Sequence, residues 1–262
     1  MIKDHELQDK LVSLLETFHQ RRLMKLHGIK LSKLLQKNPY LYRSLGVVAA
    51  SDYIKLALDA FISSSDETIF GNEFFEPLAK WAASKAFEAE PSISVQVGGG
   101  AGYDISIESA TEYKAIAVKS GTNIFNAQSS KQQDSEYGAL QARIRKEKKV
   151  FHPIIGYGYG RKVQRDANPQ VLKLAGQAFW TEVTGEDDFY LRMSSLLGDH
   201  PSKLSEEFRL AYVNVRNKLE KEFHRDFTDV SGAIYWDEVI AFSSRRNKPK
   251  AQKARSKAKD NQ

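Results

Sequence analysis

The chain has 262 residues, of which 41% are hydrophobic and 11% aromatic, so it is long enough to bury a core. It contains no cysteine, which excludes disulfides, cysteine-ligated zinc and a cysteine nucleophile. No apolar run reaches the roughly 18 residues of a transmembrane helix, so we expect no membrane partner. The N-terminus is too charged for a signal peptide, and these features together fit a reducing cytoplasm.

The formal net charge of +6 is concentrated at the C-terminus. Residues 245–262 contain eight Lys and Arg against one Asp, so this segment carries +7 and the rest of the chain −1. We therefore expect a single folded domain over residues 1–244, followed by a basic flexible tail over 245–262. Attraction to phosphate is one role for such a tail, and keeping the protein in solution is the other.

Apolar periodicity and turn residues predict the secondary structure along the chain. In chain order we expect a helix at 3–27, a turn at 37–42, helices at 51–61 and 66–88, strands at 92–97, 104–108 and 113–119, a polar helix at 124–146, strands at 151–159 and 171–174, and helices at 177–183, 187–197, 205–227 and 235–242. A capping box at Ser64–Glu67 is expected to open the helix at 66–88. This order predicts an α/β fold with a mixed β-sheet flanked by helices.

A β-hairpin is predicted around a short polar tip at 109–111. Side chains alternate between the two faces of a strand, so Asp104 lies on the face opposite to Ile105, and Lys119 on the face opposite to Val118. The tip places Asp104 against the end of the second strand, so that Asp104 and Lys119 point into the same space. Many nucleases hold a metal ion and a water molecule with an aspartate and a lysine that meet at the end of a sheet. The alternative interpretation is that Asp104 and Lys119 form an ordinary ion pair at the surface.

The helix before the hairpin offers further acidic side chains. Glu73 and Glu76 are three residues apart and share one helix face, beside a buried stripe that includes Phe74 and Leu78. A glutamate on this helix is able to reach the end of the sheet where Asp104 is expected. The alternative is that both are ordinary first-turn glutamates, favoured by the helix dipole.

Basic side chains gather at Arg143–Lys149 and at Arg161–Arg165. Arg143, Arg145 and Lys162 are therefore candidates for contacts with a nucleic-acid backbone, although each cluster is equally compatible with a solvated helix end or turn.

The glycine-rich segment Gly156–Gly160 is not a phosphate-binding loop, because no Lys-Ser or Lys-Thr pair follows it. It is predicted to be a strand end whose glycines permit close packing. The six histidines show no spacing typical of a metal site.

A set of short motifs resembles a known family in order and spacing. The motifs are Lys37-Asn-Pro-Tyr-Leu41, Ser64–Gly71, Glu76, Tyr103-Asp104, Ala117–Gly121, a polar helix with Asn126 and Gln128, Ile154–Gly158 and Gly176–Trp180. Over most of the chain they resemble a type II restriction endonuclease of the PD-(D/E)xK nuclease superfamily, and within it the PmeII-type group. The resemblance implies a restriction-endonuclease-like mixed sheet, Mg²⁺ as cofactor, site-specific hydrolysis of double-stranded DNA, a homodimer, and a prokaryotic cytoplasm.

The resemblance also implies roles for individual residues. Asp104 corresponds to the aspartate that binds the metal, and Lys119 to the lysine that orients the attacking water. Asn126 and Gln128 join the candidates for DNA contacts. The sequence departs from the family pattern at Ala117, where an acidic residue is expected.

Two interpretations account for the acidic residue that is missing at position 117. In the first, Glu76 supplies the carboxylate and is an additional catalytic acid and metal ligand. In the second, the triplet Glu112-Tyr-Lys114 is the motif, with Glu73 as the helix acid. We favour the first, because the second turns Glu112 and Lys114 onto the apolar face of the hairpin. A catalytically inactive DNA-binding protein and a repair or junction nuclease on the same fold are the alternative functions.

Overall fold

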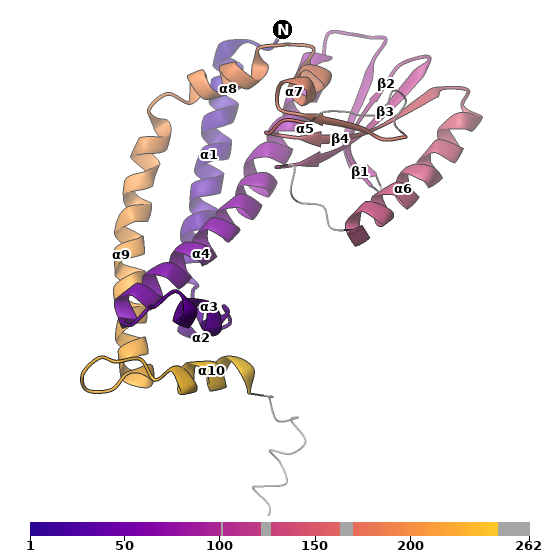
Figure 1. The fold of residues 1–262 in the computed structure, drawn as a ribbon. Coiled ribbons are helices and arrows are strands. Elements are labelled where there is room, and N and C mark those ends of the chain that lie inside the picture. The colour runs from indigo at the N-terminus through magenta and orange to yellow at the C-terminus, as the bar shows by residue number, and fades with distance from the viewer. Residues whose placement is uncertain (101, 122–126, 163–169, 246–262) are drawn as a thin grey trace, which may run out of the picture. The chain divides into compact units, whose positions relative to one another are not determined.

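The computed structural model describes residues 1–100, 102–121, 127–162 and 170–245 (Figure 1). Its elements are, in chain order, α1 (Asp4–His27), α2 (Leu31–Leu34), α3 (Pro39–Ser44), α4 (Ala50–Phe70), the π-helical turn η1 (Gly71–Phe75), α5 (Glu76–Ala86), β1 (Ser94–Gly100), β2 (Tyr103–Glu108), β3 (Glu112–Lys119), α6 (Ala127–Lys146), β4 (Val150–Tyr157), β5 (Leu172–Ala175), α7 (Gln177–Thr184), α8 (Phe189–Leu197), α9 (His200–Phe227) and α10 (Trp236–Ser244). The predicted α/β class is confirmed.

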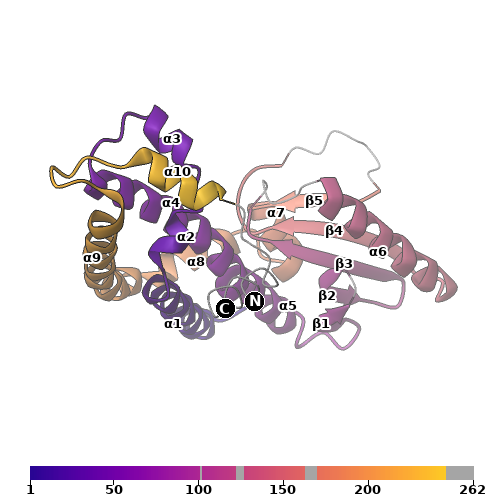
Figure 2. The same cartoon turned by 90° about the horizontal axis from the view of Figure 1, so that it is seen from below.

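The five described strands form one mixed sheet in the order β1-β2-β3-β4-β5, which can be followed in Figure 2. β1, β2 and β3 are antiparallel, whereas β3, β4 and β5 are parallel. The predicted hairpin is confirmed, with Ile105 paired to Ile116 and its tip at 109–111. The Ser109 hydroxyl accepts hydrogen bonds from the backbone N–H groups of Thr111 in the tip and of Glu112 at the start of β3, which stabilises the turn.

Helices cover both faces of the sheet (Figure 1). Ile105, Ile107, Ile116 and Val118 pack in one core together with residues of α1, α5 and α7. On the other face, α6 packs against β3 and β4 through side chains that include Tyr137. The alternation predicted for the hairpin therefore corresponds to two separate apolar layers.

The helix boundary predicted at Ser64–Glu67 is wrong, because α4 runs through it. The Thr68 hydroxyl donates to the Ser64 carbonyl one turn earlier, and Asp66 accepts a hydrogen bond of 2.8 Å from Arg22 of α1. These polar side chains are thus used within the helix and in tertiary contacts instead of at a cap.

The helical path changes geometry just before Pro77. A proline inside an α-helix lacks an N–H group, and its ring clashes with the carbonyl four residues earlier, here that of Glu73. η1 lies where this clash would occur, and α5 continues from Glu76. The predicted helix at 66–88 is therefore the end of α4 followed by η1 and α5.

The break predicted at 37–42 is confined to residues 37 and 38, because α3 begins at Pro39. The Asn38 side chain accepts hydrogen bonds from the N–H groups of Tyr40 and Leu41, and Pro39 occupies the first position of α3. An asparagine cap followed by proline is a typical helix start.

The chain divides into two compact units. Unit 1 comprises residues 1–24 and 64–209 and contains the whole sheet; unit 2 comprises 25–63 and 210–262. In unit 2, Tyr53 stacks on Phe223 with ring centroids 4.9 Å apart, and α10 lies against α3. The domain prediction for 1–244 stays a prediction, and residues 246–262 lie outside the described ranges. Within those ranges, every helix falls short of the length and apolar character needed to cross a membrane.

Candidate active site

Asp104 lies near the start of β2, at the open end of the hairpin. One carboxylate oxygen accepts a hydrogen bond of 2.8 Å from the backbone N–H of Val118 on β3. The other oxygen lies 3.9 Å from the Nζ atom of Lys80. The hairpin register and this backbone contact together fix the Asp104 carboxylate at the end of the sheet.

Glu76 and Lys80 approach the same point from α5. They are one helical turn apart, and the Lys80 Nζ atom lies 2.5 Å from Oε1 of Glu76. The Lys80 ammonium group therefore contacts the carboxylates of both Glu76 and Asp104. The three side chains are 25% (Lys80), 33% (Glu76) and 26% (Asp104) exposed, so each is partly removed from water.

Burial and the neighbouring groups shift the pKa of the Asp104 carboxyl. Burial raises the pKa of the Asp104 carboxyl, and the Val118 N–H opposes the rise by stabilising the carboxylate. The negative charge of Glu76 raises this pKa further, whereas Lys119 and Lys80 lower it, and the net direction is upward. Lys119 thus lies within electrostatic reach of Asp104, as the alternation of the hairpin predicts.

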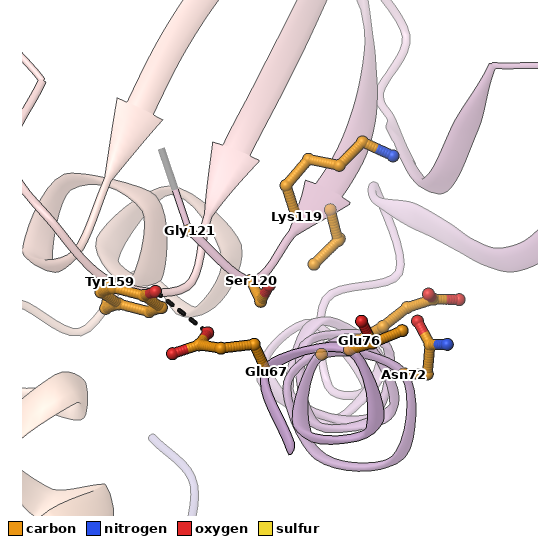
Figure 3. A pocket seen from close by; sticks show the side chains of 10 residues that line it. Glu67, Asn72, Glu76, Lys119, Ser120, Gly121 and Tyr159 are labelled. Carbon is orange, nitrogen blue, oxygen red and sulfur yellow. Dashed lines mark hydrogen bonds between the residues drawn. The ribbon is translucent and has the colours of Figure 1, made fainter. Parts of the chain in front are cut away.

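A pocket of about 540 Å³ opens beside these groups (Figure 3). Lys119 forms part of the strand side, and Glu76 and Asn72 lie on the helix that faces it. Glu67 lines the same helix side and accepts a hydrogen bond of 3.2 Å from the Tyr159 hydroxyl. The pocket therefore joins the end of β3 to the helical segment that carries Glu76.

Gly71 allows this helical segment to approach the sheet closely. A Cβ atom at Gly71 would lie 3.1 Å from the Cβ atom of Ser120, which directly follows Lys119. The absence of a side chain at Gly71 thus sets the distance between η1 and the end of β3.

Ala117 occupies the position where an acid was expected, and its surroundings are apolar. The side chain is 2% exposed and belongs to the core between the sheet and α6. The Tyr137 hydroxyl accepts a hydrogen bond from the Ala117 N–H (3.2 Å) and donates one to the Ile154 carbonyl (2.6 Å). A carboxylate at position 117 would have to enter this packed layer, whereas the Glu76 carboxylate, on α5, shares the Lys80 ammonium group with Asp104.

The alternative motif residues lie elsewhere. Lys114 is paired with Glu182 of α7 at 2.6 Å, and Glu112 lies 3.8 Å from His152. Glu112 begins β3 beside Val150, whereas Lys119 ends it. The structure therefore does not bring Glu112 and Lys114 to Asp104.

Glu73, the helix acid of the alternative motif, is also engaged away from Asp104. Its carboxylate lies 3.3 Å from Arg21 of α1.

The candidates for DNA contacts are divided between the two ends of the sheet. Arg143 and Arg145 are exposed in the last turn of α6, which leads to the start of β4, at the end away from Lys119. Lys162 follows β4 at the same end as Lys119, with its Nζ atom 5.5 Å from the centre of the Tyr157 ring. Gln128 lies in the first turn of α6, and Asn126 is outside the described residues.

Lys80 was not identified from the sequence. Its only sequence pattern is the four-residue spacing from Glu76, which is common in exposed helical ion pairs. The proximity of both residues to Asp104 depends on how α5 packs on the sheet, which the spacing does not reveal.

The residues around Asp104 fit a divalent cation. Mg²⁺ binds through one or two carboxylates and keeps several of its waters. Asp104 and Glu76 supply two partly buried carboxylates that already share one cationic group. Among the described residues, no group of three or more His, Asp or Glu side chains is arranged to hold a metal.

Comparison with known proteins gives the family. No curated protein matches the chain. The type II restriction endonuclease EcoO109I family matches residues 5–205, which include all of unit 1 except its ends. The narrower PmeII-type assignment stays a prediction. The chain therefore belongs to the type II restriction endonuclease EcoO109I family and is a site-specific deoxyribonuclease that acts on double-stranded DNA.

Proposed function

We propose that this endonuclease hydrolyses DNA with Mg²⁺ at the site formed by Asp104, Glu76 and Lys119. Asp104 and Glu76 are the metal ligands, and Lys119 positions the attacking water. The observation that carries the proposal is the convergence of the two carboxylates, 2.5 Å and 3.9 Å from a shared ammonium group, beside the pocket that Lys119 lines.

Each group matches a requirement of phosphodiester hydrolysis. A bound Mg²⁺ ion neutralises charge on the phosphate and lowers the pKa of a bound water. Asp104 is held in place for this role by the Val118 N–H, and Glu76 by its position on α5. The Lys119 ammonium supplies positive charge where hydroxide develops, on the pocket side of the strand end.

We further propose that the enzyme acts as a homodimer in a prokaryotic cytoplasm. A two-fold symmetric dimer would supply two copies of the active site, one for each strand of a palindromic DNA site. Each chain has one proposed site, at Asp104, and each copy in the dimer would therefore cut one strand of the DNA.

Digestion of plasmid and phage DNA with and without Mg²⁺ tests the proposal. We expect discrete fragments only with Mg²⁺. Asp104→Asn, Glu76→Gln and Lys119→Met should each lower the cleavage rate by about 100-fold or more, because each removes a group that acts on the reacting phosphate or water.

Lys114→Met is the matched control, since it removes a lysine of the same strand that is paired with Glu182. It should keep the fragment pattern. Loss of cleavage in Lys114→Met with activity kept in Lys119→Met would move the site to Glu112 and Lys114. Mg²⁺-independent DNA binding without cleavage in the unmodified protein would instead support the catalytically inactive DNA-binding protein.

A further inference from the structure

We propose that the Lys80 ammonium group is an internal counter-ion, which occupies the Asp104–Glu76 pair in the metal-free enzyme and which a divalent cation must displace. This inference rests on the proposed metal site. It assigns to Lys80 the role of a positioning residue that acts through the two carboxylates.

The contacts of Lys80 carry the inference. Its Nζ atom lies 2.5 Å from Oε1 of Glu76 and 3.9 Å from Oδ1 of Asp104, so a single ammonium group interacts with two carboxylates. Two carboxylates that share a partly buried site repel each other, and the negative charge of Glu76 acts on Asp104 in this way. A cation between them offsets this repulsion and keeps both groups directed at the same point.

The same contacts make Lys80 a competitor of the metal. A divalent cation that binds both carboxylates needs the space that the ammonium group fills, and two positive charges there would repel each other. Lys80 is attached through a flexible four-carbon stem and is 25% exposed, so its ammonium group is able to move into solvent. The metal affinity of the free enzyme is therefore lower than that of the two carboxylates without Lys80.

The test measures Mn²⁺ binding to the full-length, metal-free protein in the absence of DNA, with electron paramagnetic resonance reporting the free ion. Lys80→Met keeps the apolar stem and removes the charge; it should bind Mn²⁺ on the order of tenfold more tightly than the unmodified protein, because a charged hydrogen-bonded competitor is gone. Lys80→Arg retains the charge and should stay within about threefold of the unmodified protein.

Lys85→Met is the matched control. Lys85 lies on the same helix and is paired with Glu88 at 2.9 Å and with Glu6 at 3.7 Å, both separate from the Asp104 pair. Its removal changes the net charge by the same amount and should leave Mn²⁺ affinity unchanged.

Thermal unfolding gives a second measurement. In EDTA, Lys80→Met should melt below the unmodified protein, because the carboxylates have lost their counter-ion. Mg²⁺ should then raise the melting temperature of Lys80→Met by more than it raises that of the unmodified protein. A purely structural role of Lys80 would lower both melting temperatures and leave the Mg²⁺ increment unchanged. Lys80→Gln provides the same comparison if Lys80→Met does not fold.

Asp104→Asn separates failure of this inference from failure of the proposed metal site. If Mn²⁺ binds the unmodified protein and is lost in Asp104→Asn, but Lys80→Met binds equally or more weakly, the counter-ion role is wrong and the metal site stands. If Mn²⁺ binding does not depend on Asp104 in either background, the metal site itself is wrong, and the inference falls with it.

Discussion

At the scale of single residues, a buried histidine on α1 makes the stability of the protein sensitive to acid. His19 is 7% exposed, and its Nδ1 atom finds no hydrogen-bond partner within the described part of the chain. Burial lowers the pKa of His19 from 6.5, and the nearby Arg22 lowers it further. Below about pH 6.5, His19 is therefore protonated more fully in the unfolded chain than in the folded chain. Because the unfolded state binds more protons, the free energy of unfolding falls as the pH drops.

Replacing His19 tests this dependence. Urea unfolding at about pH 7 and about pH 5.5 should show a smaller loss of stability for His19→Leu than for the unmodified protein. His5→Gln, which replaces an exposed histidine of the same helix, should lose as much as the unmodified protein. Equal losses in all three proteins would mean that other groups cause the acid sensitivity.

The residues of the site differ in how far the sequence predicts them. Strand alternation predicts that Asp104 and Lys119 lie near each other, and the hairpin has the expected register; their roles as site residues come from the family resemblance. Glu76 follows only as a candidate, since its spacing also suits an ordinary helical glutamate. Lys80 does not follow at all, because its contact with Asp104 depends on helix-to-sheet packing.

At the scale of elements, we expect the substitution of glycine by alanine to have opposite effects on the free energy of unfolding at Gly156 and at Gly138. A Cβ atom at Gly156 on β4 would lie 2.2 Å from the ring of Phe179, which is fully buried. Gly156→Ala should therefore lower the free energy of unfolding by about 1–3 kcal/mol through overpacking. Gly138 is exposed within α6 and has no neighbour within 4 Å of an added Cβ atom, so Gly138→Ala should raise it by up to about 1 kcal/mol.

Chemical denaturation of the two variants checks the pair. A stability of Gly156→Ala equal to that of the unmodified protein would show that α7 moves away from β4 at little cost. The prediction for the segment Gly156–Gly160, close packing at a strand end, is confirmed by the contacts of Gly156 and Gly158.

Other element boundaries were harder to predict, for physical reasons. The residues at Ser64–Glu67 have the composition of a helix start, but their side chains bond to Arg22 of α1 and Tyr159 after β4. These tertiary contacts allow one helix to continue where local propensity favours a break. The π-helical turn before Pro77 was also missed, although the close approach of Gly71 to Ser120 places this turn against the end of β3.

At the scale of the whole molecule, the order of elements was enough to predict the mixed sheet, but the two units were not predicted. Their boundaries fall after residues 24, 63 and 209, inside α1, α4 and α9, where no change of composition marks a linker. Long helices that belong to two units look uniform in sequence, because helical periodicity does not record which unit each turn packs against.

The C-terminal charge predicts how DNA binding by the whole molecule depends on salt. Deleting residues 246–262 removes seven Lys and Arg and one Asp, and leaves 1–245 with no net charge. If these cations contact phosphates, the deletion should reduce the slope of log K against log salt by at most about 6, since each contact contributes about 0.9. Fluorescence anisotropy with a duplex that lacks the cleavage site, measured without Mg²⁺ over a range of salt concentrations, gives the slope. A full-length variant with these Lys and Arg replaced by Gln separates charge from chain length and should match the deletion.

Both variants should keep the Mg²⁺-dependent fragment pattern, because the proposed catalytic groups lie on β2, β3 and α5. An unchanged slope would leave the tail with a role in solubility instead of in DNA attraction.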